Sequence, residues 1–395
     1  MALKHLDDLE FTDKNVFVRF DFNVPLSNKQ EITDTTRIDQ AIPTIETLLE
    51  KGSHKLILCS HLGRPKGQKQ SKYSLEPVAS YLASKLGEEV LLTDNAIDCG
   101  MRDLLKLQKT RIFLLENIRF YEDETQNNHN FAKELASYAD IYINDAFGTC
   151  HRKHASTYEI TKFFPKDKAC GLLVQKEIAA LDTILETPTK PFLALIGGAK
   201  ISDKIKIIEK LLPKVDQLII GGAMAYPFLK AQGHEVGKSL CEDEDVRLAK
   251  KILAKKTSQK ILLPTDHLVA NNPDSPAQSC PDVNISPDKM GLDIGPDSIK
   301  NFSSHIRNAK TILWNGPMGF FEKKDFALGT FSMAKTIAES DSYSLVGGGD
   351  SVSALNKSGL AEQISHVSTG GGASLKYIEE GSLPGIRALR FGISS

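Results

Sequence analysis

The stretch "FLALIGGAKISDK" (residues 192–204) shows the pattern that decides the fold of this chain. Its opening apolar run is typical of a strand that is buried on both faces, as in a parallel sheet. Two glycines end the run, and a polar segment follows that we expect to open a helix. A strand, a glycine turn and a helix, in this order, are the unit from which parallel α/β sheets are built.

The same alternation runs along the chain. Further strands are predicted at 15–22, 55–60, 111–116, 140–145, 217–222, 260–266, 311–316, 342–349 and 366–372. Apolar residues recur at helical spacing in 37–52, 75–87, 128–140 and 171–187. The two prolines of "PTKPF" (188–192) interrupt the pattern and mark a boundary. The sequence therefore predicts two α/β domains with parallel sheets, joined by a helix.

Length and composition narrow the class of protein. A chain of 395 residues suits two or three domains, and its net charge of −1 gives no general attraction for nucleic acid or an anionic membrane. The charged start "MALKHLDDLEFTDK" lacks the apolar segment of a secretory signal, and no apolar run approaches the ~18 residues of a membrane span. The six cysteines are scattered without a C-x-x-C motif, which predicts reduced thiols in a cytoplasmic protein.

Polar and basic side chains follow the predicted strands of the first half. They are Asp21, Asn23, Arg37, His61, Arg64, Arg119 and Arg152. Because ligands of open α/β sheets bind at the carboxyl ends of the strands, we expect these side chains to gather at one edge. The planar fork of arginine matches carboxylate and phosphate oxygens, so the set predicts an anion pocket. The alternative is that each arginine forms an ordinary surface ion pair.

Glycines follow the predicted strands of the second half, in five turns of the form strand, glycines, helix. Glycine lets backbone N–H groups approach phosphates, and a helix N-terminus favours negative charge. Lys200 and Lys204 are four residues apart, which predicts one face of a helix whose first turn would be stabilised by a bound anion. The alternative is two solvated lysines. Asp350 is predicted either to cap a helix or to hold magnesium, or both.

Two other nucleotide-binding motifs are incomplete or absent in this sequence. "AQGHEVGKSL" (231–240) is one residue short of the P-loop spacing and follows a predicted helix rather than a strand. We therefore interpret it as a glycine turn, with Lys238 at the surface. No G-x-G-x-x-G follows any predicted strand, which argues against an NAD-dependent dehydrogenase.

Eight motifs together resemble those of the phosphoglycerate kinase family, in the family's order and across nearly the whole chain. They are "VRFDFNVP" (18–25), "SHLGRP" (60–65), "NDAFGTCHRKHAST" (144–157), "GGAKISDKI" (197–205), "GLDIGP" (291–296), "WNGPMGFFE" (314–322), "GGGDS" (347–351) and "STGGGASL" (368–375). The resemblance implies reversible phosphoryl transfer from 1,3-bisphosphoglycerate to ADP, giving 3-phosphoglycerate and ATP, in glycolysis and gluconeogenesis. It also implies a monomer of two Rossmann-like lobes with a cleft that closes by hinge bending. A catalytically inactive protein built on the same fold is the rival interpretation, and the intact Arg37, Lys200 and Asp350 argue against it.

The resemblance carries residue roles onto matching positions. Those implied to bind 3-phosphoglycerate are Asp21, Phe22, Asn23, Arg37, His61, Leu62, Gly63, Arg64, Arg119 and Arg152. Those implied to bind the nucleotide are Gly198, Ala199, Lys204, Leu240, Gly291, Asn315, Glu322, Gly348, Gly349, Asp350 and Ser351. Those implied to act on the transferred group are Arg37, Lys200, Gly370, Gly371 and Gly372. Asp350 is also implied to bind the Mg²⁺ that accompanies ATP or ADP.

The resemblance also sets expected domain limits. A substrate domain is expected over residues 1–170, an interdomain helix over 171–187 and a nucleotide domain over 188–376, with 377–395 packing back on the first domain. The implied partners are small molecules, with no nucleic acid and no membrane.

Overall fold

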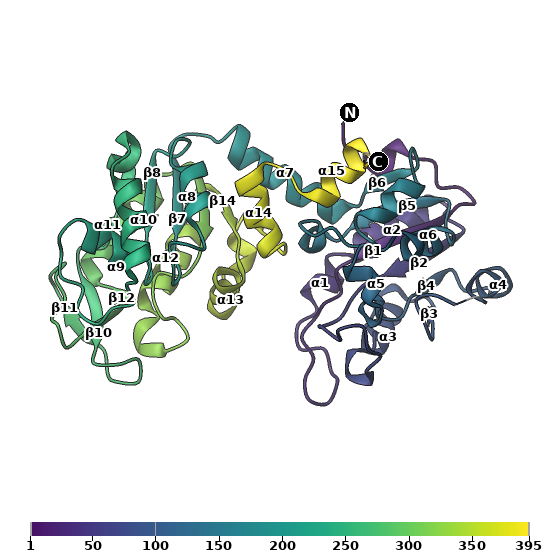
Figure 1. Ribbon diagram of the computed structural model, residues 1–395, viewed down its shortest axis with the longest axis horizontal. Coiled ribbons are helices and arrows are strands. Elements are labelled where there is room, and N and C mark those ends of the chain that lie inside the picture. Colours follow the sequence, from purple (N-terminus) through teal and green to yellow (C-terminus); the bar gives the residue numbers. More distant parts are fainter. Residues whose placement is uncertain (1, 99, 394–395) are drawn as a thin grey trace. The chain divides into compact units, whose positions relative to one another are not determined.

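The computed structural model describes residues 2–98 and 100–393, which form two units (Figure 1). The N-terminal unit comprises the described residues up to Ala179 and from Glu380 onward, and the C-terminal unit comprises Ala180–Glu379. Each unit contains a six-stranded parallel sheet, so the predicted α/β class is confirmed. The chain passes from the first unit to the second within α7 (Leu172–Glu186).

The N-terminal unit has the strand order β3-β4-β2-β1-β5-β6. Its strands are β1 (Asn15–Phe20), β2 (Lys55–Cys59), β3 (Val90–Leu92), β4 (Ile112–Leu114), β5 (Ile141–Asp145) and β6 (Lys168–Cys170). Its α-helices besides the start of α7 are α1 (Thr36–Asp39), α2 (Ile42–Glu50), α3 (Glu76–Leu86), α4 (Met101–Leu107), α5 (Glu122–Thr125), α6 (His129–Ala136) and α15 (Pro384–Phe391). The direction of strand addition reverses between β1 and β5, which is where α/β sheets place their ligands.

Register brings the ends of three central strands to the same edge. Arg19 of β1 is in register with Cys59 of β2 on one side and with Asn144 of β5 on the other. The segments that follow these strands therefore emerge together. They carry most of the polar and basic side chains that were singled out from the sequence.

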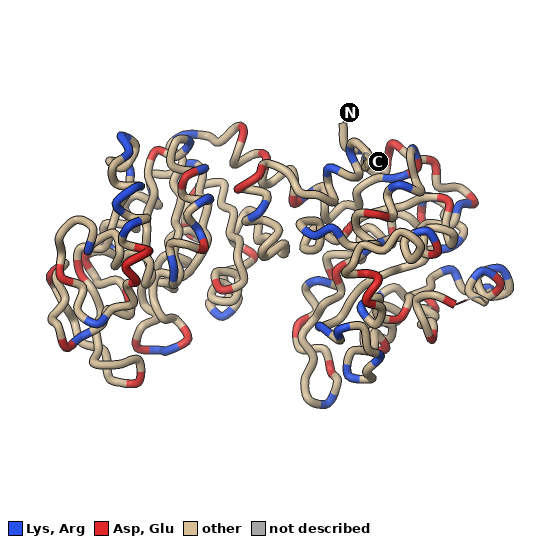
Figure 2. Tube along the Cα trace, viewed as in Figure 1, with Lys and Arg blue, Asp and Glu red and all other residues tan. Residues whose placement is uncertain are grey.

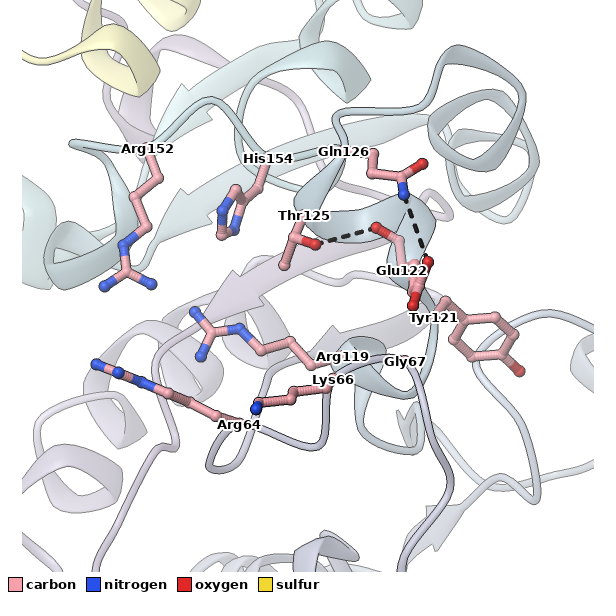
Figure 3. A pocket seen from close by; sticks show the side chains of 10 residues that line it. All are labelled: Arg64, Lys66, Gly67, Arg119, Tyr121, Glu122, Thr125, Gln126, Arg152 and His154. Atoms are coloured by element: carbon pink, nitrogen blue, oxygen red, sulfur yellow. Dashed lines mark hydrogen bonds between the residues drawn. The ribbon is translucent and has the colours of Figure 1, made fainter.

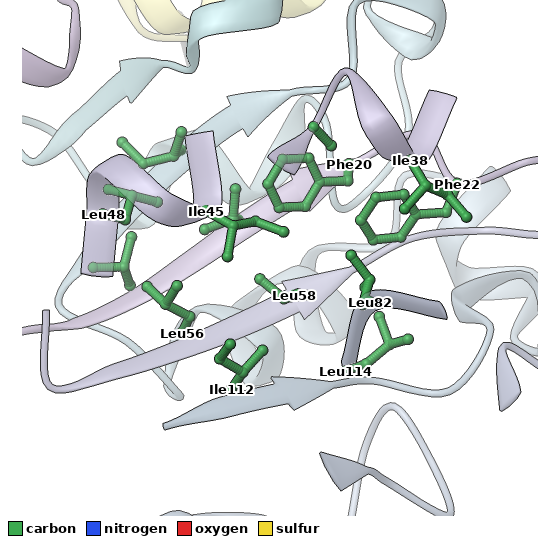
Figure 4. Close-up of a cluster of buried hydrophobic side chains, with 14 of the residues drawn as sticks. Phe20, Phe22, Ile38, Ile45, Leu48, Leu56, Leu58, Leu82, Ile112 and Leu114 are labelled. Carbon is green, nitrogen blue, oxygen red and sulfur yellow. The ribbon is translucent and has the colours of Figure 1, made fainter. Parts of the chain in front are cut away.

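A continuous apolar core holds this sheet against its helices. On the face of the sheet that α2 covers, every second residue of β1 is apolar and fully buried, as in Val16, Val18 and Phe20. They pack on Ile45 and Leu48 of α2 (Figure 4). Burial of both sheet faces explains why these strands are continuous apolar runs rather than alternating ones.

The C-terminal unit has the strand order β15-β14-β13-β7-β8-β9. Its parallel strands are β7 (Phe192–Ile196), β8 (Gln217–Ile220), β9 (Ile261–Leu262), β13 (Thr311–Asn315), β14 (Tyr343–Val346) and β15 (His366–Val367). Its α-helices besides the end of α7 are α8 (Ile205–Leu211), α9 (Ala225–Ala231), α10 (Asp243–Leu253), α11 (Pro296–Asn308), α12 (Leu328–Ala338), α13 (Gly349–Ser358) and α14 (Gly372–Glu380). Here the reversal falls between β7 and β13.

The glycine turns after β7, β8 and β13 pack backbone against backbone. A side chain at Gly316 would place its Cβ 2.1 Å from the carbonyl oxygen of Gly197, and one at Gly222 would come within 2.7 Å of the nitrogen of Gly198. Gly222 and Gly316 also have positive φ values of 65° and 104°. These glycines are therefore required by the fold of the turns themselves.

The structure adds elements that the sequence analysis missed. The strands among them are β3, β6 and a three-stranded antiparallel sheet of β10 (His267–Ala270), β11 (Gln278–Cys280) and β12 (Met290–Ile294). The predicted helix over 37–52 is also two helices, α1 and α2. Pro43 explains the break, because it has no N–H to donate and its ring crowds the carbonyl of Asp39 four residues earlier.

The described helices include none with the length and apolar character that a membrane crossing needs. Lysines and arginines are interspersed with aspartates and glutamates along both units (Figure 2). This mixture accompanies the near-zero net charge of the sequence, so any strongly basic site must arise from local side-chain packing.

Candidate active site

A basic pocket of about 500 Å³ lies at the carboxyl edge of the N-terminal sheet. Its lining residues are Arg64, Lys66, Gly67, Arg119, Tyr121, Glu122, Thr125, Gln126, Arg152 and His154. The guanidinium groups of Arg64, Arg119 and Arg152 gather on one side of it (Figure 3). Three of the four predicted arginines are thus brought together.

Local hydrogen bonds fix the direction of Arg119. Asn117 caps the short 3₁₀ helix Ile118–Phe120, because its Oδ1 accepts a 3.0 Å bond from the backbone N–H of Arg119. The side-chain Nδ2 of Asn117 donates to the carbonyl of Leu62 at 2.7 Å. Arg119 Nη1 in turn donates to the carbonyl of Gly63 at 2.9 Å. The loop after β2 and the loop after β4 are therefore joined beneath the pocket.

The charge of this pocket is unbalanced. Within residues 2–98 and 100–393, no carboxylate forms an ion pair with Arg64, Arg119 or Arg152. Burial, followed by repulsion from Arg19 and Arg152, lowers the pKa of Arg119 to about 10. An anion in the pocket would relieve this repulsion. The alternative of ordinary surface ion pairs is wrong for these three arginines.

Arg37 lies outside the lining of this pocket and contacts Asp21 instead. Arg37 Nη1 is 2.5 Å from Asp21 Oδ2. The other carboxylate oxygen of Asp21 lies 3.7 Å from His61 Nδ1. Asn23 accepts a 2.8 Å bond from the backbone N–H of Gly63, whose carbonyl already holds Arg119. The structure thus connects these residues to the basic pocket through the loop after β2.

His61 contributes a hydrogen-bonding group rather than a charge. Burial, then the positive charge of Arg19, holds its pKa well below the usual value. Arg19 is fully buried, and its Nη2 lies 3.3 Å from His61 Nδ1. Because a guanidinium only donates, Nδ1 accepts and the proton of the neutral ring is on Nε2.

Phe22 and Leu62 point away from solvent. Both side chains belong to the apolar core, with 0% and 3% of their surface exposed. The ring of Phe22 stacks on Phe20, with 5.1 Å between centroids. Any contact of these two residues with a ligand would therefore come from their backbone.

Sequence reasoning missed Lys66 and His154 as lining residues. His154 follows Arg152 by two positions in "HRKHAST", and that spacing was the available signal. Burial, then the charges of Arg119 and Arg19, lowers the pKa of His154 to about 3. His154 is therefore neutral at pH 7 and adds a polar wall to the pocket.

A second pocket, of about 310 Å³, lies at the carboxyl edge of the C-terminal sheet. Its lining residues are Gly198, Ala199, Gly222, Ala223, Leu240, Met290, Gly291, Leu292, Pro317, Gly319, Phe320, Glu322 and Asp350. Of the residues implied to bind nucleotide, this set contains Gly198, Ala199, Leu240, Gly291, Glu322 and Asp350. The sequence did not indicate the apolar walls from Met290, Leu292 and Phe320. Leu240 is 44% exposed although it is apolar, as expected of a side chain that a ligand covers.

Lys204, Asn315 and Ser351 lie behind this pocket and fasten its turns. Lys204 Nζ donates to the carbonyls of Gly197 at 2.7 Å and Asn315 at 3.1 Å, and burial lowers its pKa to about 8. Asn315 Nδ2 donates to the carbonyl of Gly347, whereas its buried Oδ1 has no partner within the described chain. Ser351 Oγ accepts a 2.5 Å bond from the N–H of Gly316.

The prediction that Lys200 and Lys204 share a helix face is wrong. The helix α8 begins at Ile205, and the segment before it forms turns. Lys200 points to Glu242, with 2.6 Å between Nζ and Oε1, while Lys204 is held by the carbonyls behind the pocket. Their side chains therefore have different partners and different exposure.

The glycines at two other turns leave room for a ligand. A Cβ added at Gly349, Gly371 or Gly372 would meet no atom within 4 Å. Gly349 and Gly372 are the first residues of α13 and α14, so open space adjoins two helix N-termini. By contrast, a Cβ at Gly291 would lie 2.0 Å from the hydroxyl of Tyr226, so this glycine is needed for packing.

Asp350 is the acidic group that fits a metal in the second pocket. It lies in the first turn of α13, whose N-cap position is taken by Gly348, so Asp350 is not the N-cap residue of this helix. Across residues 2–98 and 100–393, no cluster of three or more His, Cys, Asp and Glu side chains would hold a metal alone. A single carboxylate suits Mg²⁺ where a bound ligand supplies phosphate oxygens and water completes the coordination.

The chain is similar to one family of known proteins. A model of the phosphoglycerate kinase family matches residues 6–381. Phosphoglycerate kinase from Anaeromyxobacter sp. (strain Fw109-5) is 48% identical over 396 residues, covering 98% of this chain and 100% of that protein. The enzyme of that name from Clostridium botulinum (strain Hall / ATCC 3502 / NCTC 13319 / Type A) is 48% identical over 393 residues, covering 98% of each.

Solved structures are similar as well. Phosphoglycerate kinase from Coxiella burnetii has a TM-score of 0.87 and 39% identity, with 98% of each chain covered. That from Pyrococcus horikoshii OT3 has a TM-score of 0.84 and 30% identity, again with 98% of each chain covered.

Proposed function

This chain belongs to the phosphoglycerate kinase family, and we propose that its basic pocket binds 3-phosphoglycerate while its second pocket binds ATP or ADP. The family transfers a phosphoryl group between 1,3-bisphosphoglycerate and ADP in glycolysis, and the chain is accordingly a phosphotransferase. The observation that carries the proposed placement is the cluster of Arg64, Arg119 and Arg152, which has no carboxylate partner in the described chain.

The reaction needs no general base. When ATP is consumed, the nucleophile is the carboxylate of 3-phosphoglycerate, and in the opposite direction it is a phosphate oxygen; both are ionised near pH 7. The chemistry then depends on holding the two substrates in line and on stabilising charge on the transferred group. Arginines, a lysine and helix N-termini suit such a reaction.

In the basic pocket, the three arginines hold the phosphate of 3-phosphoglycerate by charge-assisted hydrogen bonds. His61 donates from Nε2 as a neutral ring. Asp21 and Asn23 orient the substrate hydroxyl, and the ion pair of Asp21 with Arg37 aims that arginine. Arg37 then stabilises the phosphoryl group in the transition state, together with Lys200 and the N–H groups of 370–372.

In the second pocket, Leu240 and the apolar wall cover the base, and Glu322 binds the ribose hydroxyls. The phosphates extend toward α13, where Gly348 to Ser351 begin the helix. Asp350 holds Mg²⁺, which neutralises phosphate charge when bound.

A crossed binding experiment tests the placement. Arg64→Ala should weaken calorimetric binding of 3-phosphoglycerate and leave ATP binding unchanged, because only the basic pocket loses a charge. Leu240→Asp should weaken ATP binding alone, because an exposed apolar wall becomes anionic. Both positions are at pocket surfaces, so the variants should fold. The proposed placement fails if either variant affects the other substrate instead.

Transfer between substrates on two units requires that the units close during the reaction, which also excludes water. We expect the radius of gyration in X-ray scattering to fall when both substrates are present and not with either alone. An unchanged radius with both substrates would contradict hinge-bending closure.

The assembly and compartment are proposed to be a monomer in the cytoplasm. The monomer is proposed from the family resemblance, and the five described cysteines are free thiols, as in a reducing compartment. Sedimentation at micromolar concentration and cell fractionation test these two proposals; a stable dimer or an exported protein would contradict them.

A further inference from the structure

Lys200, which the proposed function assigns to the transferred phosphoryl group, is bound to a carboxylate in this structure. Its Nζ lies 2.6 Å from Glu242 Oε1, and the two side chains are 42% and 51% exposed. Glu242 comes two residues after Leu240, which lines the nucleotide pocket, and directly before α10. The segment that closes one side of the pocket therefore also holds the lysine.

A second contact fixes the same loop to the same helix end. Asp245, in the first turn of α10, accepts a 3.0 Å bond from the backbone N–H of Ser202 and is only 4% exposed. The loop is thus anchored by its backbone, independently of Glu242. The Lys200 side chain is the movable part, because its ion pair is open to solvent and its loop stays in place without it.

We propose that Glu242 is a positioning residue that holds the amino group of Lys200 until the terminal phosphoryl group of ATP displaces it. The inference rests on the proposed role of Lys200 in the C-terminal unit. Exposed ion pairs contribute little to stability, so an incoming group with about two negative charges competes readily with one carboxylate. The hydrogen bond and charge of Glu242 also raise the pKa of Lys200, which keeps the amino group cationic.

The exchange predicts a difference between two nucleotides. ATP has the terminal phosphoryl group that competes for Lys200, whereas ADP does not. Removing the charge of Glu242 should therefore tighten ATP binding about two- to five-fold, as expected for loss of one weak exposed competitor. The affinity for ADP should change only as much as it does when another negative charge near the pocket is removed.

Calorimetric titration of the full chain with Mg-ATP and Mg-ADP tests this, using Glu242→Gln. Glu244→Gln is the matched charge control, since Glu244 is exposed in the first turn of α10 and the carboxylate that pairs with Lys200 is that of Glu242. Glu209→Gln is the matched ion-pair control, because Glu209 and Lys255 form a similarly exposed pair at 2.5 Å. We expect only Glu242→Gln to raise the preference for ATP over ADP, and we expect Lys200→Met to abolish that effect.

Each outcome is decisive. An ATP-to-ADP preference that is equal in the Glu242→Gln and Glu244→Gln variants would overturn the inference. So would an effect that persists in the Lys200→Met background, or a fall in kcat with unchanged ATP affinity, which would mean that Glu242 aims the lysine in the transition state. Failure of the proposed function is distinguishable, because the unmodified chain would then show no phosphoryl transfer at all.

Discussion

Arg37 Nη1 lies 2.5 Å from Asp21 Oδ2, and Asp21 is the more buried partner, with 10% of its side chain exposed against 35% for Arg37. The carboxylate follows β1 and the arginine lies in α1, so the pair joins the end of a central strand to the first helix. The bond from Nη1 to Asp21 thereby fixes the direction of the Arg37 side chain, while the rest of the guanidinium group is open to solvent. This geometry is compatible with the proposed role of Arg37 toward the transferred phosphoryl group.

Arg37→Ala should therefore lower kcat more than it raises the KM for ATP. Loss of one preorganised donor to a transition state costs about 10²- to 10³-fold in kcat. Steady-state kinetics with both substrates varied checks this. Arg102→Ala is the control, because Arg102 forms a distant exposed pair with Glu134 at 3.4 Å. A near-normal kcat in Arg37→Ala would remove Arg37 from the transition state.

Lys200→Ala and Lys238→Ala distinguish the two lysine motifs of the C-terminal unit. Lys238 is exposed and its backbone N–H donates to the carbonyl of Lys289, so it belongs to a surface turn. We expect Lys200→Ala to lose most turnover, by about 10²-fold or more, as for loss of a transition-state donor. Lys238→Ala should keep turnover within about two-fold, since surface changes of this kind are close to neutral. The reverse result would restore a phosphate-binding role for "AQGHEVGKSL".

Gly316→Ala and Gly349→Ala should fail in different ways. At Gly316, a positive φ of 104° and a Cβ only 2.1 Å from the carbonyl of Gly197 should cost about 2–4 kcal/mol of stability. At Gly349, the added methyl meets no atom, so stability should change by less than about 1 kcal/mol while ATP binding weakens. Urea unfolding and ATP titration of both variants check this. Normal ATP affinity in a stable Gly349→Ala variant would place the phosphates elsewhere.

His154 should make stability depend on pH below neutrality. Its native pKa is about 3 against an ordinary value of 6.5, so in this window the unfolded chain binds a proton that the native protein does not. Above pH 6.5 His154 does not lower the free energy of unfolding. As the pH falls below 6.5, the free energy of unfolding decreases by up to about 1.4 kcal/mol for each pH unit. The stability of the wild type relative to His154→Gln, from urea unfolding, should therefore fall between pH 7 and pH 5. A constant difference, or a His154 NMR signal that titrates near pH 6.5, would contradict this.

The presence of parallel α/β sheets in both halves could be predicted because buried parallel strands are short apolar runs with glycine or polar residues at their ends. β7 and its turn are a clear case. The antiparallel sheet could not be predicted, since β11 consists of Gln278–Cys280, which are polar and largely exposed. Its pairing with β10 depends on tertiary contacts that leave no apolar period in the sequence.

Residues of the candidate site could be predicted from the sequence, but the contacts of their side chains could not. The arginines of the basic pocket were found because they follow successive strands whose ends meet at one edge. The direction of the Lys200 side chain could not be predicted. Helical spacing does not reveal that Glu242, 42 residues away in the sequence, binds its amino group. Gly222 and Gly316, which lie in turns that were interpreted as a nucleotide cradle, are also required by close packing of the turns on one another.

Turnover of the purified chain with Mg-ATP and 3-phosphoglycerate tests the central claim most directly, with ADP formation followed by a coupled assay. The structure predicts ADP formation that requires both substrates, falls sharply in Arg37→Ala and Lys200→Ala, and persists in Lys238→Ala. Absence of ADP formation from a folded chain that binds both substrates would contradict it and would favour a catalytically inactive member of the family.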